Sequence, residues 1–403
     1  MNKKLLFIIL YLYALVFSVL KTIRFPNGWS EAHWMMDYRL GFIKRGLAGA
    51  FFGFFFERNE QSILFLSSVI LLTLYGLLIS IAYRETLRNR GNIYTVLLYL
   101  LFFLSQYIIF SAHLIGYLDH LIFLLTILVI WLLRKRMIIL SSLLVSISIL
   151  IHEVSFFLML PICCFALVVN EIDQTKLSPK NILSSGLIKK MIMFLVLPLA
   201  ITCGVSIYQE VLGRNNYNQI FNYLDHLKFI DRNVAKSVAS AYTIKFTVYF
   251  NEESPRFFQR IFASKCSVFF GIPILFMMYL VYKQFERVNR CLLLLLAVII
   301  LIPLCLHAIA YDNYRIWSFP FIILFLGFWI LNSKVKAKST TDNKMSMIEV
   351  SFAIVSFLLI SLVPSYLMDN EVERFSTIQR VMILIPLIIL GIYYFKKAPI
   401  KGY

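Results

Sequence analysis

Residues 29–49 read WSEAHWMMDYRLGFIKRGLAG, and they lie between a first apolar segment and the next long one. This span combines a carboxylate, cations, tryptophans and glycines: Asp37, Arg39, Lys44, Arg45, Trp29, Trp34, Gly41, Gly46 and Gly49. Ionisable side chains beside a membrane are energetically costly, and they often mark functional sites. We therefore expect the rest of the chain to form a scaffold that builds a pocket around residues 29–49.

The composition predicts a protein that crosses a membrane several times. Of the 403 residues, 60% are hydrophobic and 15% are charged, and the mean hydropathy is +0.80. Repeated long apolar runs of this kind are typical of membrane helices. The net charge of +18 is spread over short loops rather than gathered in one basic stripe, so it does not predict binding to nucleic acid. It fits contact with anionic lipid headgroups or with phosphate-bearing substrates.

Twelve apolar runs predict an all-α polytopic transmembrane bundle of about 12 helices, which forms a single integral membrane domain over residues 1–403. The runs cover roughly residues 5–20, 61–83, 92–112, 117–133, 137–151, 154–170, 191–208, 266–282, 291–311, 316–333, 350–368 and 381–395. With the N-terminus in the cytoplasm, more than half of the 39 Lys and Arg residues fall in cytoplasmic loops, as the positive-inside rule requires. Both termini are then cytoplasmic.

The long connection of residues 209–265 falls on the predicted outer face. Apolar residues recur in it at helical spacing, at Ile220, Phe221, Leu224, Leu227 and Ile230. We therefore expect a large helical extracytoplasmic loop that covers the pocket. Residues 46–56, GLAGAFFGFFF, are too short to span a bilayer and predict a helix that lies at the interface or re-enters partway.

Asp37 is the first candidate for catalysis. A carboxylate flanked by cations beside the membrane can act as a general base toward a sugar hydroxyl, or as a metal ligand. Arg39, Lys44 and Arg45 can bind a diphosphate, because a guanidinium presents a planar pair of donors to phosphate oxygens. The alternatives are an ordinary ion pair for Asp37 and contact with lipid headgroups for the three cations.

Two more clusters fall on the same predicted face. His152 and Glu153 form the whole turn between two short apolar runs, so we expect a polar pocket to enter the outer half of the membrane there and count both residues as catalytic candidates. In HAIAYDNYRIW, Asp312 and Arg315 are suited to position a phosphate and a sugar. The alternatives are an exposed hinge at 152–153 and a structural pair between Asp312 and Arg315.

His113 and Asp119 complete the candidate substrate-binding residues. Together with His120 they are also of metal-ligand type, but their spacing matches no strong ligand signature. The metal and the cofactor are therefore unknown from the sequence: a divalent cation stays open, and no motif requires one. The six cysteines lie in or beside apolar runs without a CxxC pair, which favours a packing role.

Three short stretches carry a resemblance to a known class: DYRLGFIKRGL (37–47), HE (152–153) followed by Pro161, and DNYRIW (312–317). They are similar to bacterial polytopic proteins of surface-polysaccharide assembly, namely integral-membrane glycosyltransferases of the GT-C type and O-antigen polymerases. This resemblance implies a catalytic acid in the first extracytoplasmic loop, and Asp37 has that place. Many members carry a second acid beside the first, whereas Tyr38 and Arg39 follow Asp37 here.

The resemblance implies an enzyme of the bacterial cytoplasmic (inner) membrane that acts at its outer face on a polyprenyl-(di)phosphate-linked saccharide. The long outer loop and the lack of a double acid favour polymerisation of O-antigen or capsule repeat units over transfer of a single sugar. A lipid-linked oligosaccharide flippase is the alternative from another class, although transporters typically place charges near the midplane. Other polysaccharide-assembly proteins are further expected partners.

Overall fold

The computed structural model describes residues 3–171, 185–335, 345–368 and 371–397, and its regular secondary structure there is helical throughout. The predicted all-α class is therefore confirmed. Each predicted apolar run is helical over most of its length. Within the described ranges, seven helical segments are long and apolar enough to cross a membrane: Lys3–Leu20, Glu60–Arg88, Ile93–His113, Ser185–Asp225, Lys265–Gln284, Arg290–Ala308 and Asn313–Lys334. The other apolar helices are shorter, so the number of about 12 crossings stays a prediction.

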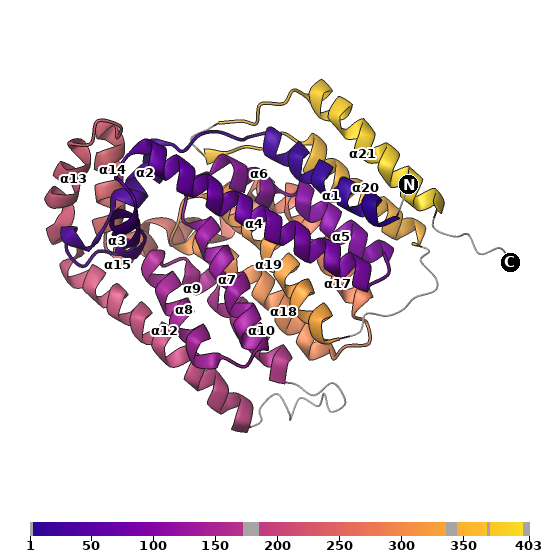
Figure 1. Cartoon of the computed structure of the whole chain (residues 1–403), viewed down its shortest axis with the longest axis horizontal. Coiled ribbons are helices and arrows are strands. Elements are labelled where there is room, and N and C mark those ends of the chain that lie inside the picture. Colours follow the sequence, from indigo (N-terminus) through magenta and orange to yellow (C-terminus); the bar gives the residue numbers. More distant parts are fainter. Residues whose placement is uncertain (1–2, 172–184, 336–344, 369–370, 398–403) are drawn as a thin grey trace.

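The apolar helices lie side by side in an elongated bundle (Figure 1). Asn and Ser side chains begin several of them by accepting a hydrogen bond from a backbone N–H of the first turn, as Asn59, Asn92 and Ser346 do. The bundle consists of α1 (Lys3–Leu20), α4 (Glu60–Arg88), α5 (Ile93–Leu104), α6 (Gln106–His113), α7 (Asp119–Arg134), α8 (Ile138–Ile151), α9 (Ser155–Leu158), α10 (Leu160–Glu171), α12 (Ser185–Leu212), α16 (Lys265–Phe269), α17 (Gly271–Gln284), α18 (Arg290–Leu301), η5 (Ile302–Ala308), α19 (Asn313–Lys334), α20 (Met347–Leu362) and α21 (Thr377–Lys397).

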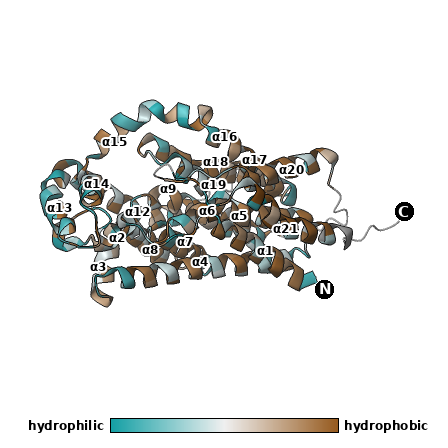
Figure 2. Cartoon of the chain, turned by 90° about the horizontal axis from the view of Figure 1, so that it is seen from above, coloured by the Kyte–Doolittle hydropathy of each residue, from teal (hydrophilic) through white to brown (hydrophobic). Residues whose placement is uncertain are grey.

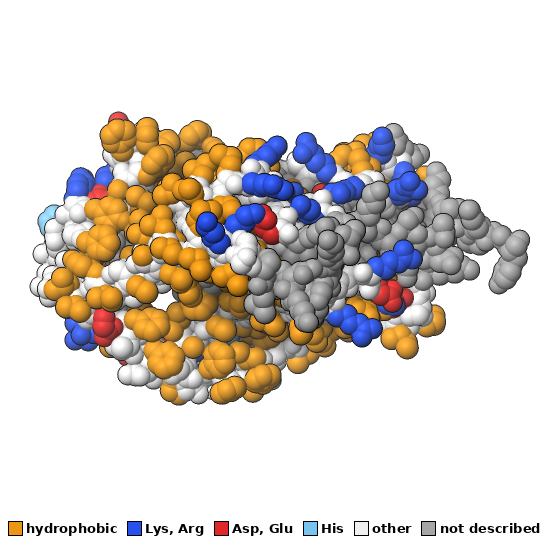
Figure 3. Space-filling model, turned by 90° about the horizontal axis from the view of Figure 1, so that it is seen from below, with side chains coloured by type: hydrophobic (Ala, Val, Ile, Leu, Met, Phe, Trp, Pro, Cys, Tyr) orange, Lys and Arg blue, Asp and Glu red, His pale blue; other side chains and the backbone are white. Residues whose placement is uncertain are grey.

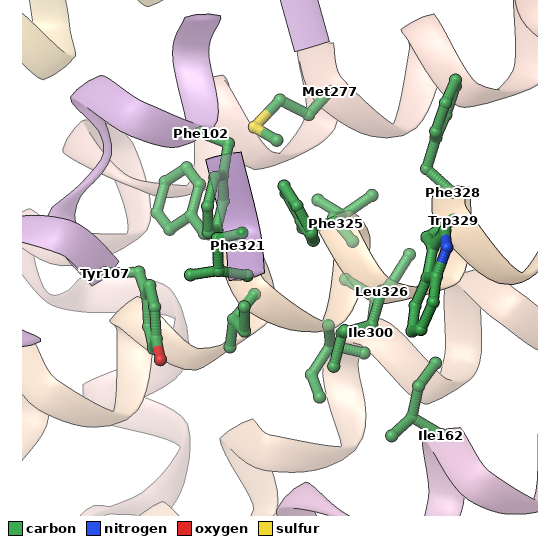
Figure 4. Close-up of a cluster of buried hydrophobic side chains, with 14 of the residues drawn as sticks. Phe102, Tyr107, Ile162, Met277, Ile300, Phe321, Phe325, Leu326, Phe328 and Trp329 are labelled. Atoms are coloured by element: carbon green, nitrogen blue, oxygen red, sulfur yellow. The ribbon is translucent and has the colours of Figure 1, made fainter. Parts of the chain in front are cut away.

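The centre of the bundle is α19. Its sequence is apolar on all sides, and 94% of its most apolar stretch is buried, as expected of a helix surrounded by other helices. Figure 4 shows Phe321 and Phe325 of α19 among side chains of neighbouring helices, including Phe102. The rings of Phe102 and Phe325 have centroids 4.4 Å apart. Close packing of this kind holds apolar helices together in a lipid environment, where the hydrophobic effect adds little between them.

Shorter helices cover one end of the bundle, at the left of Figure 1. A second hydrophobic core, which includes Trp34, Phe52, Ile220 and Ala235, holds them together. Most of residues 213–263 are helical, whereas residues 209–212 continue α12. The helices of this end are α2 (Gly28–Met35), η1 (Tyr38–Leu40), α3 (Gly46–Phe55), η2 (Gly213–Asn216), α13 (Tyr217–Asp225), α14 (Arg232–Thr243), α15 (Phe246–Glu253), η3 (Ser254–Arg256) and η4 (Gln259–Ala263).

The sides of the molecule are apolar, as contact with lipid requires. Figure 3 shows hydrophobic side chains over much of one face of the molecule. Figure 2 shows α3 and α15 on opposite sides of the end that carries α13 and α14. Both elements expose phenylalanines, for example Phe54 of α3 and Phe246 of α15, which are 81% and 49% exposed. These features, with the long apolar helices, indicate a membrane protein.

Replacement of Gly49 by Ala is expected to destabilise the fold. A Cβ at Gly49 would lie 2.1 Å from the Met36 carbonyl oxygen, and backbone cannot move aside as a flexible side chain can. We expect a loss of about 1–3 kcal/mol, measured as a lower melting temperature in detergent.

The matched control is Gly76→Ala in α4, where a Cβ meets nothing within 4 Å. Alanine favours a helix over glycine by about 1 kcal/mol, so Gly76→Ala should melt at or slightly above the wild-type temperature. Equal melting temperatures for the two variants would contradict the close approach of α3 to the Trp34–Met36 backbone.

Candidate functional site

A cavity of about 600 Å³ lies between the bundle and the helices that cover its end. Segments far apart in the sequence form its walls: α2, the residues before α3, the α8–α9 turn, α12, α14, α15 and the stretch from η5 into α19. The ionisable and histidine side chains that line it are His33, Lys44, Arg45, His152, Glu153, Asp312 and Arg315. The fold therefore brings together residues from three clusters that the sequence predicts separately.

One wall of the cavity is an ion pair between Arg45 and Glu153. The Arg45 Nε donates to Glu153 Oε2 at 2.7 Å, and a second guanidinium N–H donates to the other carboxylate oxygen, Oε1. Lys44 Nζ lies 3.9 Å from Oε1, and His152 Nδ1 lies 3.2 Å from Oε2. Glu153 therefore holds two cations in place at the cavity surface.

The backbone conformation before α3 places Lys44 and Arg45 at the cavity. Arg45 has φ +60°, in the left-handed region that non-glycine residues seldom adopt. Gly46 follows it, and a Cβ there would lie 2.8 Å from the Tyr38 ring. Such strain persists only where surrounding contacts impose it, and it is frequent at functional sites.

The electrostatics of this wall follow from burial and close charges. Burial alone would raise the pKa of Glu153, but Arg45, His152 and Lys44 hold it well below its usual range. Burial lowers the pKa of Lys44 to about 8, against the opposing effect of Glu153. Lys44 is thus a cation at neutral pH that loses its charge in mildly alkaline solution.

Arg315 forms the second cationic wall. Its Nε and one terminal nitrogen donate to Asp119 Oδ2 at 2.9 and 2.6 Å, and its other terminal nitrogen donates to Asp312 Oδ2 at 3.0 Å. Its guanidinium carbon lies 5.4 Å from the centre of the Tyr117 ring. Asp119 does not line the cavity, but its buried carboxylate fixes the guanidinium that does.

Asp37, Arg39 and His113 lie outside the residues that line the cavity. Asp37 is 2% exposed, accepts from the Arg39 backbone N–H at 2.8 Å and pairs with the guanidinium groups of Arg39 and Arg58. Burial opposes its ionisation, but hydrogen bonds from Arg39 and Arg58 leave its pKa below the ordinary value. His113 Nε2 lies 3.6 Å from Glu371 Oε2, away from this site.

Sequence reasoning missed a second pair of residues, His33 and Tyr242. Both are buried, and His33 Nδ1 lies 2.8 Å from the Tyr242 hydroxyl. His33 stands four residues after Trp29, and both line the cavity from one face of α2. That spacing was a usable signal for His33. No such signal pointed to Tyr242, because it lies 209 residues from His33 in the sequence.

The described residues contain no cluster of three or more His, Cys, Asp or Glu side chains arranged to hold a metal ion. His113, Asp119 and His120, the group of metal-ligand type in the sequence, do not form such a cluster.

Asp37→Asn is expected to destabilise the protein by about 1–3 kcal/mol, because two guanidinium groups lose their carboxylate at a buried position. Thermal unfolding in detergent measures the loss. Asp231→Asn is the control, since the Asp231 side chain begins α14 by accepting a hydrogen bond from the Asn233 backbone N–H, and asparagine caps helices equally well. An Asp37→Asn variant of wild-type stability would contradict this structural role of Asp37.

Comparison with known proteins gives no relative from which to infer the function. The chain matches no family model, no curated protein and no solved structure. The arguments about its function therefore rest on the geometry and chemistry of the cavity.

Proposed function

We propose that this chain is a glycosyltransferase of a bacterial inner membrane that acts at the outer face on a polyprenyl-(di)phosphate-linked saccharide. The observation that carries the proposal is the cavity in which Lys44, Arg45 and Arg315 meet the carboxylates of Glu153 and Asp312. In the proposed arrangement the cavity opens to the outer face of the membrane. Both termini are then cytoplasmic, the bundle crosses the membrane about 12 times, and residues 209–265 lie outside.

The cations are suited to the phosphates of the donor. Arg45 and Arg315 offer planar pairs of N–H donors, and Lys44 adds a charge between pH 6 and about 8. In a partly buried cavity, such groups also stabilise the negative charge that develops on a departing phosphate. Each guanidinium is held at the cavity by a carboxylate, with which a bound phosphate competes for the N–H donors.

The remaining lining suits a lipid-linked sugar. Apolar side chains from α9, α12, η5 and the residue that follows η5 form one part of the cavity, among them Phe156, Phe157, Val205, Leu306 and Ile309. Polar and aromatic groups from α2, α12 and α15 form another, including Trp29, Gln209 and Tyr249. Ligand pockets commonly combine a mainly apolar lining with a few placed polar groups.

Glu153 is our favoured general base, with His152 beside it. In the reaction, the acceptor hydroxyl oxygen forms a bond to the anomeric carbon, the bond from that carbon to the phosphate oxygen breaks, and the hydroxyl proton passes to Glu153. Binding of phosphate to Arg45 and Lys44 weakens their hold on Glu153, so the pKa of Glu153 rises and the carboxylate becomes a better base. Asp37 then supports the loop that carries both cations.

Polymerisation of repeat units is the favoured reaction, because the connection over residues 209–265 is long and no second acid stands beside Asp37. Transfer of a single sugar is the alternative within the same chemistry. The flippase alternative is disfavoured because the ionisable side chains of the cavity gather at one end of the bundle.

Glu153→Gln is expected to abolish the reaction in cells. In a deletion strain that accumulates the single-unit product, wild-type protein should restore the polysaccharide ladder on a gel and Glu153→Gln should not, at equal abundance in membranes. Glu252→Gln, on the exposed surface of α15, is the control and should restore the ladder.

The same experiment separates the alternatives. A deletion strain that accumulates an incomplete repeat unit would indicate transfer of a single sugar. An unchanged ladder in the deletion strain would contradict both reactions.

Binding of a soluble prenyl diphosphate is expected to weaken as the pH rises through about 8, because Lys44 then loses its charge. Titration calorimetry with geranyl diphosphate between pH 6.5 and 9.5 measures this change on the purified protein. Lys44→Arg stays charged throughout and should flatten the profile. Parallel profiles for the wild type and Lys44→Arg would show that Lys44 does not contact the phosphate.

A further inference from the structure

The pair formed by His33 and Tyr242 has no part in the chemistry described above. His33 lines the cavity from α2, and Tyr242 packs behind it from α14. The imidazole is 6% exposed, and the tyrosine is 1% exposed. An edge contact to Tyr117, with ring centroids 5.7 Å apart, also fixes the plane of the imidazole. His33 is thus held between the Tyr242 hydroxyl, which contacts Nδ1, and the ring of Tyr117.

The hydrogen bond to Tyr242 decides which nitrogen of His33 carries the proton. Among the described residues, His33 Nδ1 is the only partner of the Tyr242 hydroxyl, at 2.8 Å. A buried hydroxyl that left its proton unpaired would lose a hydrogen bond without compensation, so the hydroxyl donates and Nδ1 accepts. In neutral imidazole the proton then sits on Nε2, which makes no hydrogen bond to another described residue.

The surroundings keep His33 neutral. Burial is the largest influence and places its pKa well below the ordinary value, and the charges of Arg45 and Arg315 act in the same direction. His152 also lowers its pKa, whereas Glu153 opposes the shift. His33 therefore presents an uncharged N–H donor beside Arg45 and Arg315, whose positive charges would repel a protonated imidazole.

We propose that His33 donates its Nε2–H to a phosphate oxygen of the ligand, and that Tyr242 sets the imidazole tautomer for this role. This inference rests on the proposed function. The Arg45 guanidinium carbon lies 5.6 Å from the centre of the Tyr242 ring, so the His33 donor and the Arg45 cation flank the same part of the cavity. The positive charge of Arg45 favours an anionic ligand there. A phosphate oxygen there accepts from both groups.

Two conservative variants separate a donor from a merely structural imidazole. In His33→Gln the amide nitrogen occupies the place of Nε2 and keeps the donor. In His33→Asn the shorter side chain reaches only the place of Nδ1 and loses it. Titration calorimetry with geranyl diphosphate should show His33→Gln within about threefold of wild type and His33→Asn weaker by roughly tenfold or more.

Tyr242→Phe provides a second variant should His33→Asn fail to fold. It keeps the ring and frees the imidazole to exchange tautomers, so binding should weaken by roughly threefold to tenfold. In ¹⁵N spectra of labelled histidines, of which the chain has six, wild-type His33 should show the Nε2–H tautomer without titration between pH 5.5 and 8. Tyr242→Phe should show a mixture.

The failures are distinguishable. Wild-type protein that binds no geranyl diphosphate would overturn the proposed function and this inference together. Wild-type protein that binds it, with His33→Asn binding equally well, would overturn only the role of His33. If His33→Gln bound geranyl diphosphate as weakly as His33→Asn, the role of His33 as a donor would also be overturned. A protonated His33 at pH 6.5 would overturn it as well.

Discussion

The ion pair between Arg45 and Glu153 is the constraint on which the site depends. It joins the strained residue before α3 to the turn between α8 and α9, so an element of the covering end is fixed to the bundle at the cavity itself. A buried carboxylate without a partner is very costly, and so is a buried cation. Arg45 and Glu153 are only partly exposed, so their ion pair stabilises both groups, and Lys44 and His152 add further contacts to the carboxylate at the cavity wall.

The same requirement explains the rest of the polar arrangement. Arg315 is held by Asp119 and Asp312, and Asp37 is held by two guanidinium groups at a separate position. In the proposed function, an anionic ligand that enters the cavity would compete with Glu153 and Asp312 for the cations, and its binding would raise the basicity of the carboxylates.

The apolar bundle supplies the rigidity that such a site needs. Burial of α19 on all sides, and close aromatic contacts such as that between Phe102 and Phe325, leave the central helices little freedom. Arg315 stands in the first turn of this helix. Its guanidinium is therefore placed by the best-packed element of the fold, whereas Lys44 and Arg45 are placed by a short loop that Asp37 and Gly49 support.

The sequence by itself determined the helical class, the position of each apolar helix and the short polar stretches that carry ionisable residues, because apolar run length and charge placement are local properties. It also identified Lys44, Arg45, Glu153, Asp312 and Arg315, which do line one cavity. Only the tertiary structure separated these residues from Asp37, because the position of a carboxylate relative to a cavity depends on which distant guanidinium it meets. The pairing of His33 with Tyr242, across 209 residues, was likewise decided by packing alone.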